Sequence, residues 1–546
     1  MKRLFLILTL CLATVAASAD SSQKVKPTKN LIVMITDGTS NAALSIARWY
    51  QYHLDNSRTS LNIDPYVCGL VRTYHVNSPI VASSGAMTSY MTGKLVTSNN
   101  ISVYPKAHPG ADIEYVDPAK MYQPLATVLE AMKIEQLKST GLVATIYFPH
   151  ATPAACASHA EERGNYDDIK YQMASQGLDV LFSGGNGRID KAMLDILESQ
   201  GITYYKNDYD AFKAHKSGKV WSLFGKSDMD YEIDRDPQQQ PSLKEMAMKA
   251  IELLSKDKDG FFLMVEGSKV DHAAHANDPI TTITEFLAFD EAVGAVLDFA
   301  KKDGNTTVVI LPDHGTANIT MGDKNYSGYY KKPVDSVFVN MSKVKMSYSK
   351  LSGLVNKCKP EDVKAVFEQN SGLTLKPAQL KELLACKGVV EGDYMEVANS
   401  KNSSSTIAKI YQQNTHIGFH GGNHTAEDVF LAIYHPKGTT TQGIITNVQL
   451  NEYLCKVAGL KVSLDDVTKK QFVSHKELFP GAEFEIVGEK EKMPQLVVRK
   501  GGKVLKTTAY TAEVEVDGVK YKTQTPVVFL RPTALFYLPA EFGKML

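Results

Sequence analysis

Five short apolar runs along the chain end abruptly at polar residues. They are rich in β-branched residues and lack polar alternation, which is typical of strands buried on both faces of a sheet. Between them, apolar residues recur every three or four positions, as in amphipathic helices. This pattern predicts an α/β fold with a largely parallel central sheet flanked by helices. The runs are residues 30–35, 141–148, 260–266, 305–311 and 428–434.

The hydrophobic pattern changes twice towards the C-terminus. Residues 326–413 are polar, helix-prone and serine-rich, which indicates a helical insertion that acts as a cap or a partner surface. Residues 473–546 carry short alternating strands, with hairpin signals at Gly501-Gly502 and Asp517-Gly518, which predict a small C-terminal β appendage. The sheet domain takes the remaining mature residues, 20–325 and 414–472.

The N-terminus has the pattern of an export signal. Lys2 and Arg3 precede an apolar run that reaches Ala16, and residues 17–19 are small residues suited to cleavage. The apolar run is too short to span a bilayer, so we expect no stable membrane anchor. Residues 1–19 are therefore predicted to be the signal peptide of a periplasmic or extracellular protein.

Composition narrows the choice of partners. The 60 Lys and Arg residues balance 60 Asp and Glu residues, so no net field attracts nucleic acid, and an anionic substrate must be held by local charge. Five of the six cysteines follow the predicted signal, which leaves at least one unpaired and excludes a disulfide scaffold. Cys358 and Cys386 bracket a helical stretch and would form a local bridge in an oxidising compartment.

Metal-ligand residue types follow the predicted strands. Asp37, Glu266 and the pair Asp313-His314 close three of the five runs, and in open α/β sheets this edge binds ligands. Taken one at a time, such residues are more often helix caps or surface pairs. Two further candidates are four residues apart, so on a helix both would point to one side, and a third precedes the last run. These are Asp271, His275 and His424.

The whole set points to metal. Four carboxylates and three histidines gathered at one edge would repel and desolvate one another without cations. Mixed nitrogen and oxygen ligands suit zinc, and an all-oxygen position suits magnesium. Two cations about 3.5–4 Å apart can hold both the attacking and the leaving oxygen of an in-line phosphoryl transfer.

The segment VASSGAMTSY, residues 81–90, places two serines before a run of small residues. A serine hydroxyl of ordinary pKa is a poor nucleophile at neutral pH, and the neighbours of Ser83 and Ser84 include no base. A cation bound at the sheet edge would supply the missing activation. A start of a helix is the alternative interpretation of this segment, and the two are compatible.

These motifs together resemble those of the alkaline phosphatases. ITDG is similar to the family's strand-end aspartate motif, VEGSKVDHAAH to its Glu-x4-Asp-x3-His motif, LPDHG to its Asp-His pair and GGNHTAED to its final histidine motif. HATPAACASHAEER is similar to the segment that carries a threonine and, eleven residues on, an arginine. The resemblance covers about residues 30–325 and 421–460, in the same order, and does not extend to the insertion or the appendage.

The resemblance implies two Zn²⁺ and one Mg²⁺. One zinc would present the water that attacks the phosphoenzyme, the second would bind the nucleophile, and magnesium would lie beside the second. The implied ligands of the first zinc are Asp271, His275 and His424. Those of the second zinc are Asp37, Asp313 and His314, and those of magnesium are Asp37, Thr152 and Glu266.

The resemblance also selects the nucleophile. In the family it lies ten residues before the glycine that ends a small-residue run, and counting back from Gly93 gives Ser83 rather than Ser84. Arg163 would grip two phosphate oxygens with its planar fork. Ala82 stands where the family commonly has an aspartate that orients the arginine. We therefore expect a freer Arg163 and weaker phosphate binding than in relatives with that aspartate.

Two histidines stand where some members of the family carry Asp and Lys. The resemblance implies that His150 lies close to the magnesium ion, beyond its direct ligands, and that His272 lies near the phosphate, in contact through water. The alternative is that both are ordinary polar residues of the sheet edge.

The sequence therefore predicts an exported, metal-dependent hydrolase of phosphate monoesters that acts through a phosphoserine. A phosphodiesterase of the same superfamily is the nearest alternative, although Thr152 with Glu266 favours a dianionic monoester. A sulfatase would need a Cys-x-Pro-x-Arg segment, which the sequence lacks. A catalytically silent, metal-stabilised binding protein is the alternative from another class. The family is commonly dimeric, which makes a homodimer possible.

Overall fold

A ten-stranded sheet runs through the centre of the protein. The structure is a computed structural model that describes residues 25–322, 328–389 and 392–546; the predicted signal peptide, 1–19, lies outside the described residues. The strands of the sheet, in chain order, are β1 (Asn30–Thr36), β2 (Val67–Arg72), β3 (Ser139–Tyr147), β4 (Val180–Gly184), β5 (Ile202–Lys206), β6 (Lys219–Leu223), β7 (Phe261–Gly267), β8 (Thr306–Leu311), β13 (Val429–Tyr434) and β14 (Gly443–Thr446).

The sheet is largely parallel, as the sequence predicts. Its strand order is β14-β2-β13-β8-β1-β7-β3-β4-β6-β5, and the seven strands from β8 to β5 pair in parallel. β13 runs antiparallel to both of its neighbours, β2 and β8. β8, β1 and β7 are adjacent, so the polar residues that follow their carboxyl ends come out at one edge.

Two hydrophobic cores lie on opposite faces of the sheet. Successive side chains of β1 alternate between them: Leu31, Val33 and Ile35 enter one core, whereas Ile32 and Met34 enter the other. Burial on both faces explains why the strand sequences show no polar alternation.

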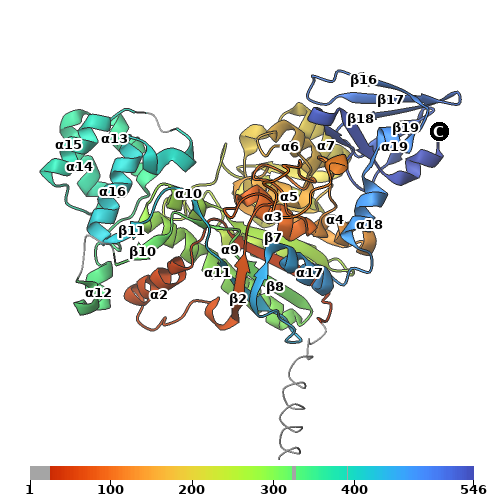
Figure 1. Cartoon of the computed structure of the whole chain (residues 1–546). Coiled ribbons are helices and arrows are strands. Elements are labelled where there is room, and N and C mark those ends of the chain that lie inside the picture. The colour runs from red at the N-terminus through yellow and green to blue at the C-terminus, as the bar shows by residue number, and fades with distance from the viewer. Residues whose placement is uncertain (1–24, 323–327, 390–391) are drawn as a thin grey trace, which may run out of the picture.

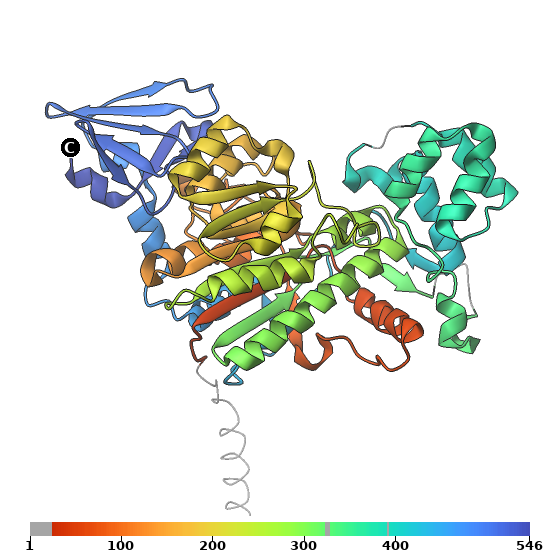
Figure 2. The same cartoon turned by 180° about the vertical axis from the view of Figure 1, so that it is seen from behind.

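Helices cover each face (Figures 1 and 2). The first core includes α3 (Ser83–Thr92), α4 (Val128–Gln136), α5 (Ala151–Ala157), α6 (Tyr166–Ser175), α7 (Lys191–Ser199), α17 (Asn447–Ala458) and α18 (Leu464–Gln471). The second includes α2 (Ala42–Leu54), α8 (Tyr209–Ala214), α9 (Leu243–Leu254), α10 (Lys269–His275) and α11 (Pro279–Asp303).

A helical lobe lies at one end of the molecule and two small sheets lie at the other (Figures 1 and 2). The lobe consists of α12 (Val334–Phe338), α13 (Tyr348–Lys357), α14 (Val363–Ser371), α15 (Pro377–Cys386), the 3₁₀ helix η6 (Tyr394–Asn399) and α16 (Ser403–Thr415). The small sheets consist of β15 (Val473–Ser474), β21 (Val528–Leu530) and β22 (Leu535–Leu538), and of β16 (Glu483–Val487), β17 (Gln495–Lys500), β18 (Lys503–Thr508), β19 (Glu513–Val516) and β20 (Val519–Lys522).

The two predicted hairpins are present. Gly501-Gly502 joins β17 to β18 and Asp517-Gly518 joins β19 to β20, with positive φ at all four residues, as a tight two-residue turn requires. The helical insertion and the β appendage are thus confirmed as parts of the fold. Their exact boundaries stay a prediction.

The expected bridge between Cys358 and Cys386 is wrong for this structure, in which both residues are free thiols. Each sulfur has a local partner within reach: Cys358 Sγ faces the carbonyl oxygen of Val355 at 3.3 Å, and Cys386 Sγ faces Thr406 Oγ1 at 3.1 Å. The sequence pattern indicated a helical stretch between the two cysteines, but it did not determine how far apart they lie in space. Over the described ranges, no helix is long and apolar enough to cross a membrane.

Candidate metal centre

Three adjacent strands deliver carboxylates to the same edge of the sheet. Asp37 follows β1, Glu266 is the penultimate residue of β7, and Asp313 lies two residues beyond β8. All three side chains are buried, with at most 1% of their surface exposed. The carboxyl edge of the sheet therefore places three acidic groups in the protein interior, as the apolar runs predicted.

A glycine allows the turn after β1 to approach α10. Gly38 has φ of +64°, and a Cβ atom there would lie 2.3 Å from Asp271 Oδ1. Its backbone N–H donates to Asp313 Oδ1 at 3.0 Å. Only glycine combines this backbone conformation with such close packing.

The first group of potential ligands surrounds a serine. Asp37, Asp313 and His314 each offer a ligand atom, and these atoms lie within 4.8 Å of one another. Ser83 Oγ lies 3.2 Å from His314 Nε2. On the other side of the ring, Thr316 Oγ1 lies 3.2 Å from His314 Nδ1 and donates its own proton to Asp271, so Nδ1–H donates and Nε2 keeps a lone pair.

The structure distinguishes the two serines. Ser83 begins α3, and its hydroxyl points towards the first group. The Ser84 hydroxyl donates instead to the carbonyl oxygen of Ser98. Gly93 ends the helix in the left-handed conformation, with φ of +70°. This is the glycine that lies ten residues after Ser83 and identified it in the sequence.

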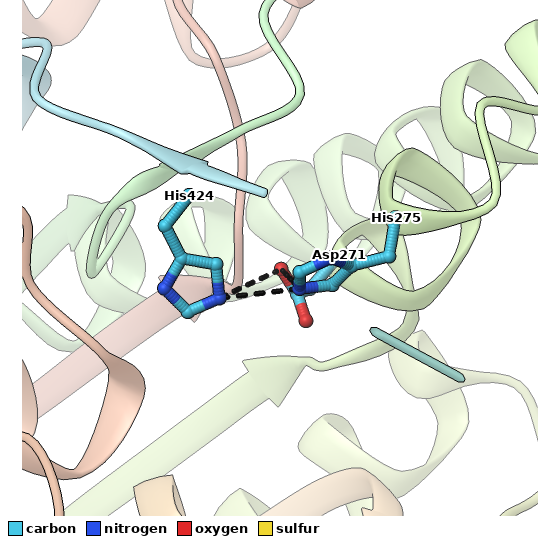
Figure 3. A group of neighbouring side chains, drawn as sticks. All are labelled: Asp271, His275 and His424. Carbon is cyan, nitrogen blue, oxygen red and sulfur yellow. Dashed lines mark hydrogen bonds and ion pairs between the residues drawn. The ribbon is translucent and has the colours of Figure 1, made fainter. Parts of the chain in front are cut away.

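The second group brings together Asp271, His275 and His424 (Figure 3). Asp271 and His275 lie one turn apart in α10, and His424 reaches them from β12 (His424–Thr425), which pairs with β9 (Gly315–Thr316). The two imidazole Nε2 atoms are 3.2 Å apart, and Asp271 Oδ1 lies 3.4 Å from that of His275.

The tautomers of these two histidines are fixed by the backbone. His275 Nδ1–H donates to the carbonyl oxygen of Gly422 at 2.6 Å, and His424 Nδ1–H donates to that of Val81 at 2.9 Å. In neutral rings both Nε2 atoms would then carry lone pairs that face each other and a carboxylate. Such an arrangement repels itself unless a cation lies between the three groups, and a histidine that donates to a carbonyl is typical of metal sites.

The third group contains Asp37, His150 and Glu266. Thr152, two residues after His150 in the first turn of α5, is also fully buried. Among the described residues, Thr152 Oγ1, His150 Nδ1 and both oxygens of Asp37 and Glu266 are buried without a hydrogen-bond partner. Buried oxygens without a partner are costly, and a hard cation would satisfy those of Asp37, Glu266 and Thr152.

The pKa values show the same crowding. Burial raises the pKa of Asp37 well above its usual range, and the charges of Asp313, Asp271 and Glu266 raise it further. Burial raises the pKa of Glu266 to about 8 and that of Asp313 to about 7. Burial also acts to raise the pKa of Asp271, but four neighbouring histidines outweigh it and hold that pKa below its usual range.

Arg163 has a partner that the sequence did not indicate. Its Nη2 donates to His150 Nε2 at 2.8 Å. Ala82, where the family commonly has an aspartate, has no polar side chain to offer Arg163, and its backbone N–H donates to His75 Nε2 at 3.1 Å. His272 lies beside the second group, where its Nδ1 is 3.7 Å from Asp228 Oδ2 and its Nε2 is buried without a partner among the described residues.

All the predicted site residues therefore come together at one edge of the sheet. Three neighbours escaped the sequence analysis: Thr316, which links His314 to Asp271; His75, which fixes the backbone before Ser83; and Tyr394, whose ring stacks on His272. Thr316 follows LPDHG directly and its position was a usable signal. Tyr394 lies in the insertion, where no motif marked it.

Comparisons with known proteins identify the family. The alkaline phosphatase family model matches residues 28–186 and 176–460. Alkaline phosphatase 3 of Bacillus subtilis is 31% identical over 456 residues, which cover 80% of this chain and 90% of that protein. The chain belongs to the alkaline phosphatase family and is a phosphatase.

Solved structures show the same fold. That of Thermus thermophilus alkaline phosphatase superposes with a TM-score of 0.69 at 22% identity, covering 83% of this chain and 98% of that one. A variant of TAB5 alkaline phosphatase, from an Antarctic bacterium, superposes with a TM-score of 0.55 at 22% identity, covering 80% of this chain and all of that one. The TAB5 variant has Mg bound in its M3 site.

Proposed function

We propose that this phosphatase hydrolyses phosphate monoesters through a phosphoserine at Ser83, at a site that holds two Zn²⁺ and one Mg²⁺. The observation that carries the proposal is the pair of Nε2 atoms of His275 and His424, 3.2 Å apart beside Asp271, with each ring's Nδ1 turned to a backbone carbonyl oxygen. The Ser83 hydroxyl lies beside the neighbouring group of the same edge.

The donor sets fit these ions. The first two groups combine histidine nitrogens with carboxylate oxygens, which suits zinc. In the third group the single lone pair of neutral His150 is taken by Arg163, since arginine can only donate. The oxygens of Asp37, Glu266 and Thr152 remain, and an all-oxygen set suits magnesium. Cations bound there would lower the pKa of the Ser83 hydroxyl and balance the charge of the phosphate.

The chain's own residues perform the displacement. Ser83 Oγ, freed of its proton, attacks phosphorus in line, so that the serine O–P bond forms as the alcohol O–P bond breaks and the alcohol leaves with a proton. Arg163 binds two phosphate oxygens through its planar fork, and the N-terminus of α3 favours the negative charge on Ser83. Water then cleaves the phosphoserine, which releases phosphate and restores the hydroxyl.

Trapping of the phosphoserine tests this proposal. Protein loaded with zinc and magnesium should incorporate labelled inorganic phosphate at acid pH, and the label should map to Ser83. Ser83→Ala should abolish the label and lower monoester turnover by about 10³-fold or more. Ser84→Ala is the matched control and should retain both. Label on Ser84, or a faster turnover of diesters than of monoesters, would contradict the proposal.

We also propose that the protein is exported, on the basis of residues 1–19. N-terminal sequencing of the secreted protein should give Asp20 as the first residue. A mature chain that still begins with Met1 would oppose export by this signal.

A further inference from the structure

The helical lobe sends one aromatic side chain to the candidate metal centre. Tyr394 begins η6, which packs against α10. The tyrosine ring stacks on the ring of His272, with centroids 3.8 Å apart and planes at 27°, and meets the ring of His275 edge-on at 5.7 Å. Tyr394 remains partly exposed.

Three further rings form a chain of contacts that begins at Tyr394. His272 meets His150 at 6.4 Å and 81°, and His150 meets Tyr147 at 5.3 Å and 83°, both edge-to-face. We call Tyr394, His272, His150 and Tyr147 the aromatic wall. Arg163 donates to His150 within this wall and is in electrostatic contact with the Tyr394 phenol. The wall therefore borders the place where the phosphate would lie.

The geometry of transfer puts the alcohol beside this wall. Ser83 lies with Asp37, Asp313 and His314, so an in-line attack directs the leaving oxygen to the opposite side of phosphorus, towards Asp271, His275 and His424. Tyr394 contacts His275, a member of that second group. The carbon skeleton of the alcohol is attached to the leaving oxygen, so it lies next to the second group and therefore close to Tyr394.

We infer that Tyr394 contacts the alcohol part of the substrate and makes the enzyme favour esters of flat, aromatic alcohols. The inference rests on the proposed monoester hydrolysis. Aromatic pairs gain about 0.5–1.5 kcal/mol beyond the burial of area, which corresponds to a preference of about 2- to 12-fold. A small aliphatic alcohol offers no ring to this surface.

Matched esters test the inference. In benzyl, cyclohexylmethyl and ethyl phosphate the alcohol is primary in each case, while the first two differ in flatness and the third is small. With protein loaded with zinc and magnesium, Tyr394→Ala should lower kcat/KM for benzyl phosphate about fivefold and leave ethyl phosphate within about twofold. Cyclohexylmethyl phosphate should lose less than benzyl phosphate. Inhibition by inorganic phosphate, which has no alcohol part, should stay within about twofold.

Two variants control for indirect effects. Tyr394→Phe keeps the ring and should retain the preference for benzyl phosphate. Tyr330→Ala removes an exposed tyrosine from the same insertion and should change nothing. An equal loss for all three esters together with weaker phosphate inhibition would show that Tyr394 acts only through His272, and unchanged kinetics would show no contact; either result overturns the inference.

The failure of the inference is distinguishable from failure of the proposed function. If the parent protein forms no phosphoserine and hydrolyses none of the three esters, monoester hydrolysis itself is wrong. If the parent and Tyr394→Ala both form the phosphoserine but have the same ratio of kcat/KM values, only the role of Tyr394 is wrong.

Discussion

At the scale of single residues, we expect the departure at Ala82 to weaken phosphate binding. Arg163 donates to a neutral imidazole here, whereas the family's common aspartate would offer a charged acceptor. Charge-assisted hydrogen bonds exceed neutral ones by about 1 kcal/mol, so Ala82→Asp should tighten competitive inhibition by inorganic phosphate about fivefold. Ala82→Asn, with the same shape and no charge, should tighten it less. An inhibition constant unchanged in Ala82→Asp would refute this role for position 82.

If the third group binds a cation as proposed, we expect the choice of ion to depend on Arg163 through His150. Its one lone pair accepts from Arg163, which withholds a nitrogen ligand from the group that contains Asp37 and Glu266. Arg163→Met should free that nitrogen and shift the third position from magnesium towards zinc, by about tenfold in relative affinity. Equilibrium dialysis against both ions, followed by metal analysis, measures the shift.

A double variant separates this effect from the loss of charge. Removing the positive charge of Arg163 strengthens the binding of both ions, whereas freeing a nitrogen favours zinc alone. Arg163→Met combined with His150→Asn should therefore return the zinc-to-magnesium ratio to that of the parent. If Arg163→Met keeps its zinc preference without His150, the lone pair of the imidazole is not the cause.

At the scale of elements, the ends of three parallel strands bring buried carboxyl groups together, and this makes the stability of the metal-free protein depend on pH. Glu266, next to the end of β7, has its pKa raised to about 8, above its value in the unfolded chain, so this carboxyl holds a proton in the folded metal-free protein at a pH where the unfolded chain has lost it. The contribution of this carboxyl to stability should therefore fall as pH rises from about 7 to about 8.5. Protein dialysed against EDTA should lose about 2 °C of Tm over this range.

Bound cations, or a neutral side chain at position 266, should each reduce the loss of Tm as pH rises. Zinc and magnesium favour the ionised carboxylates, so the loaded protein should keep its Tm as pH rises. Glu266→Gln cannot ionise, and the metal-free variant should show a smaller loss than the metal-free parent. A metal-free parent whose Tm rises over the same range would mean that the sign is wrong.

The elements also show what the sequence could and could not predict. The ends of β1, β7 and β8 were predictable because unbroken apolar runs stop where polar ligands begin. The direction of β13 was not, since burial on both faces removes polar alternation in parallel and antiparallel strands alike. The bond from Arg163 to His150 and the ring of Tyr394 depend on packing between distant segments, and no local spacing encodes them.

At the scale of the whole molecule, a bidentate ion pair helps to join the C-terminal segment to α6. Arg531 donates two hydrogen bonds to the carboxylate of Asp168 in α6, at 2.9 and 3.0 Å, and also donates to backbone carbonyls of Glu489, Glu491 and Lys492. The Asp168 carboxylate is nearly buried, so loss of its partner leaves a charge with poor hydration.

Arg531→Met should therefore lower Tm by a few degrees, because a bidentate pair with one buried member contributes about 2 kcal/mol. The kcat/KM for monoesters at 25 °C should stay within about twofold, since Arg163 is held separately by His150 and by its backbone N–H to Asn99. Lys191→Met breaks an exposed helical pair with Asp195 and should leave Tm unchanged. A loss of kcat/KM at 25 °C well beyond twofold would instead make the appendage part of the active site. An unchanged Tm would mean that Arg531 does not hold the appendage in place.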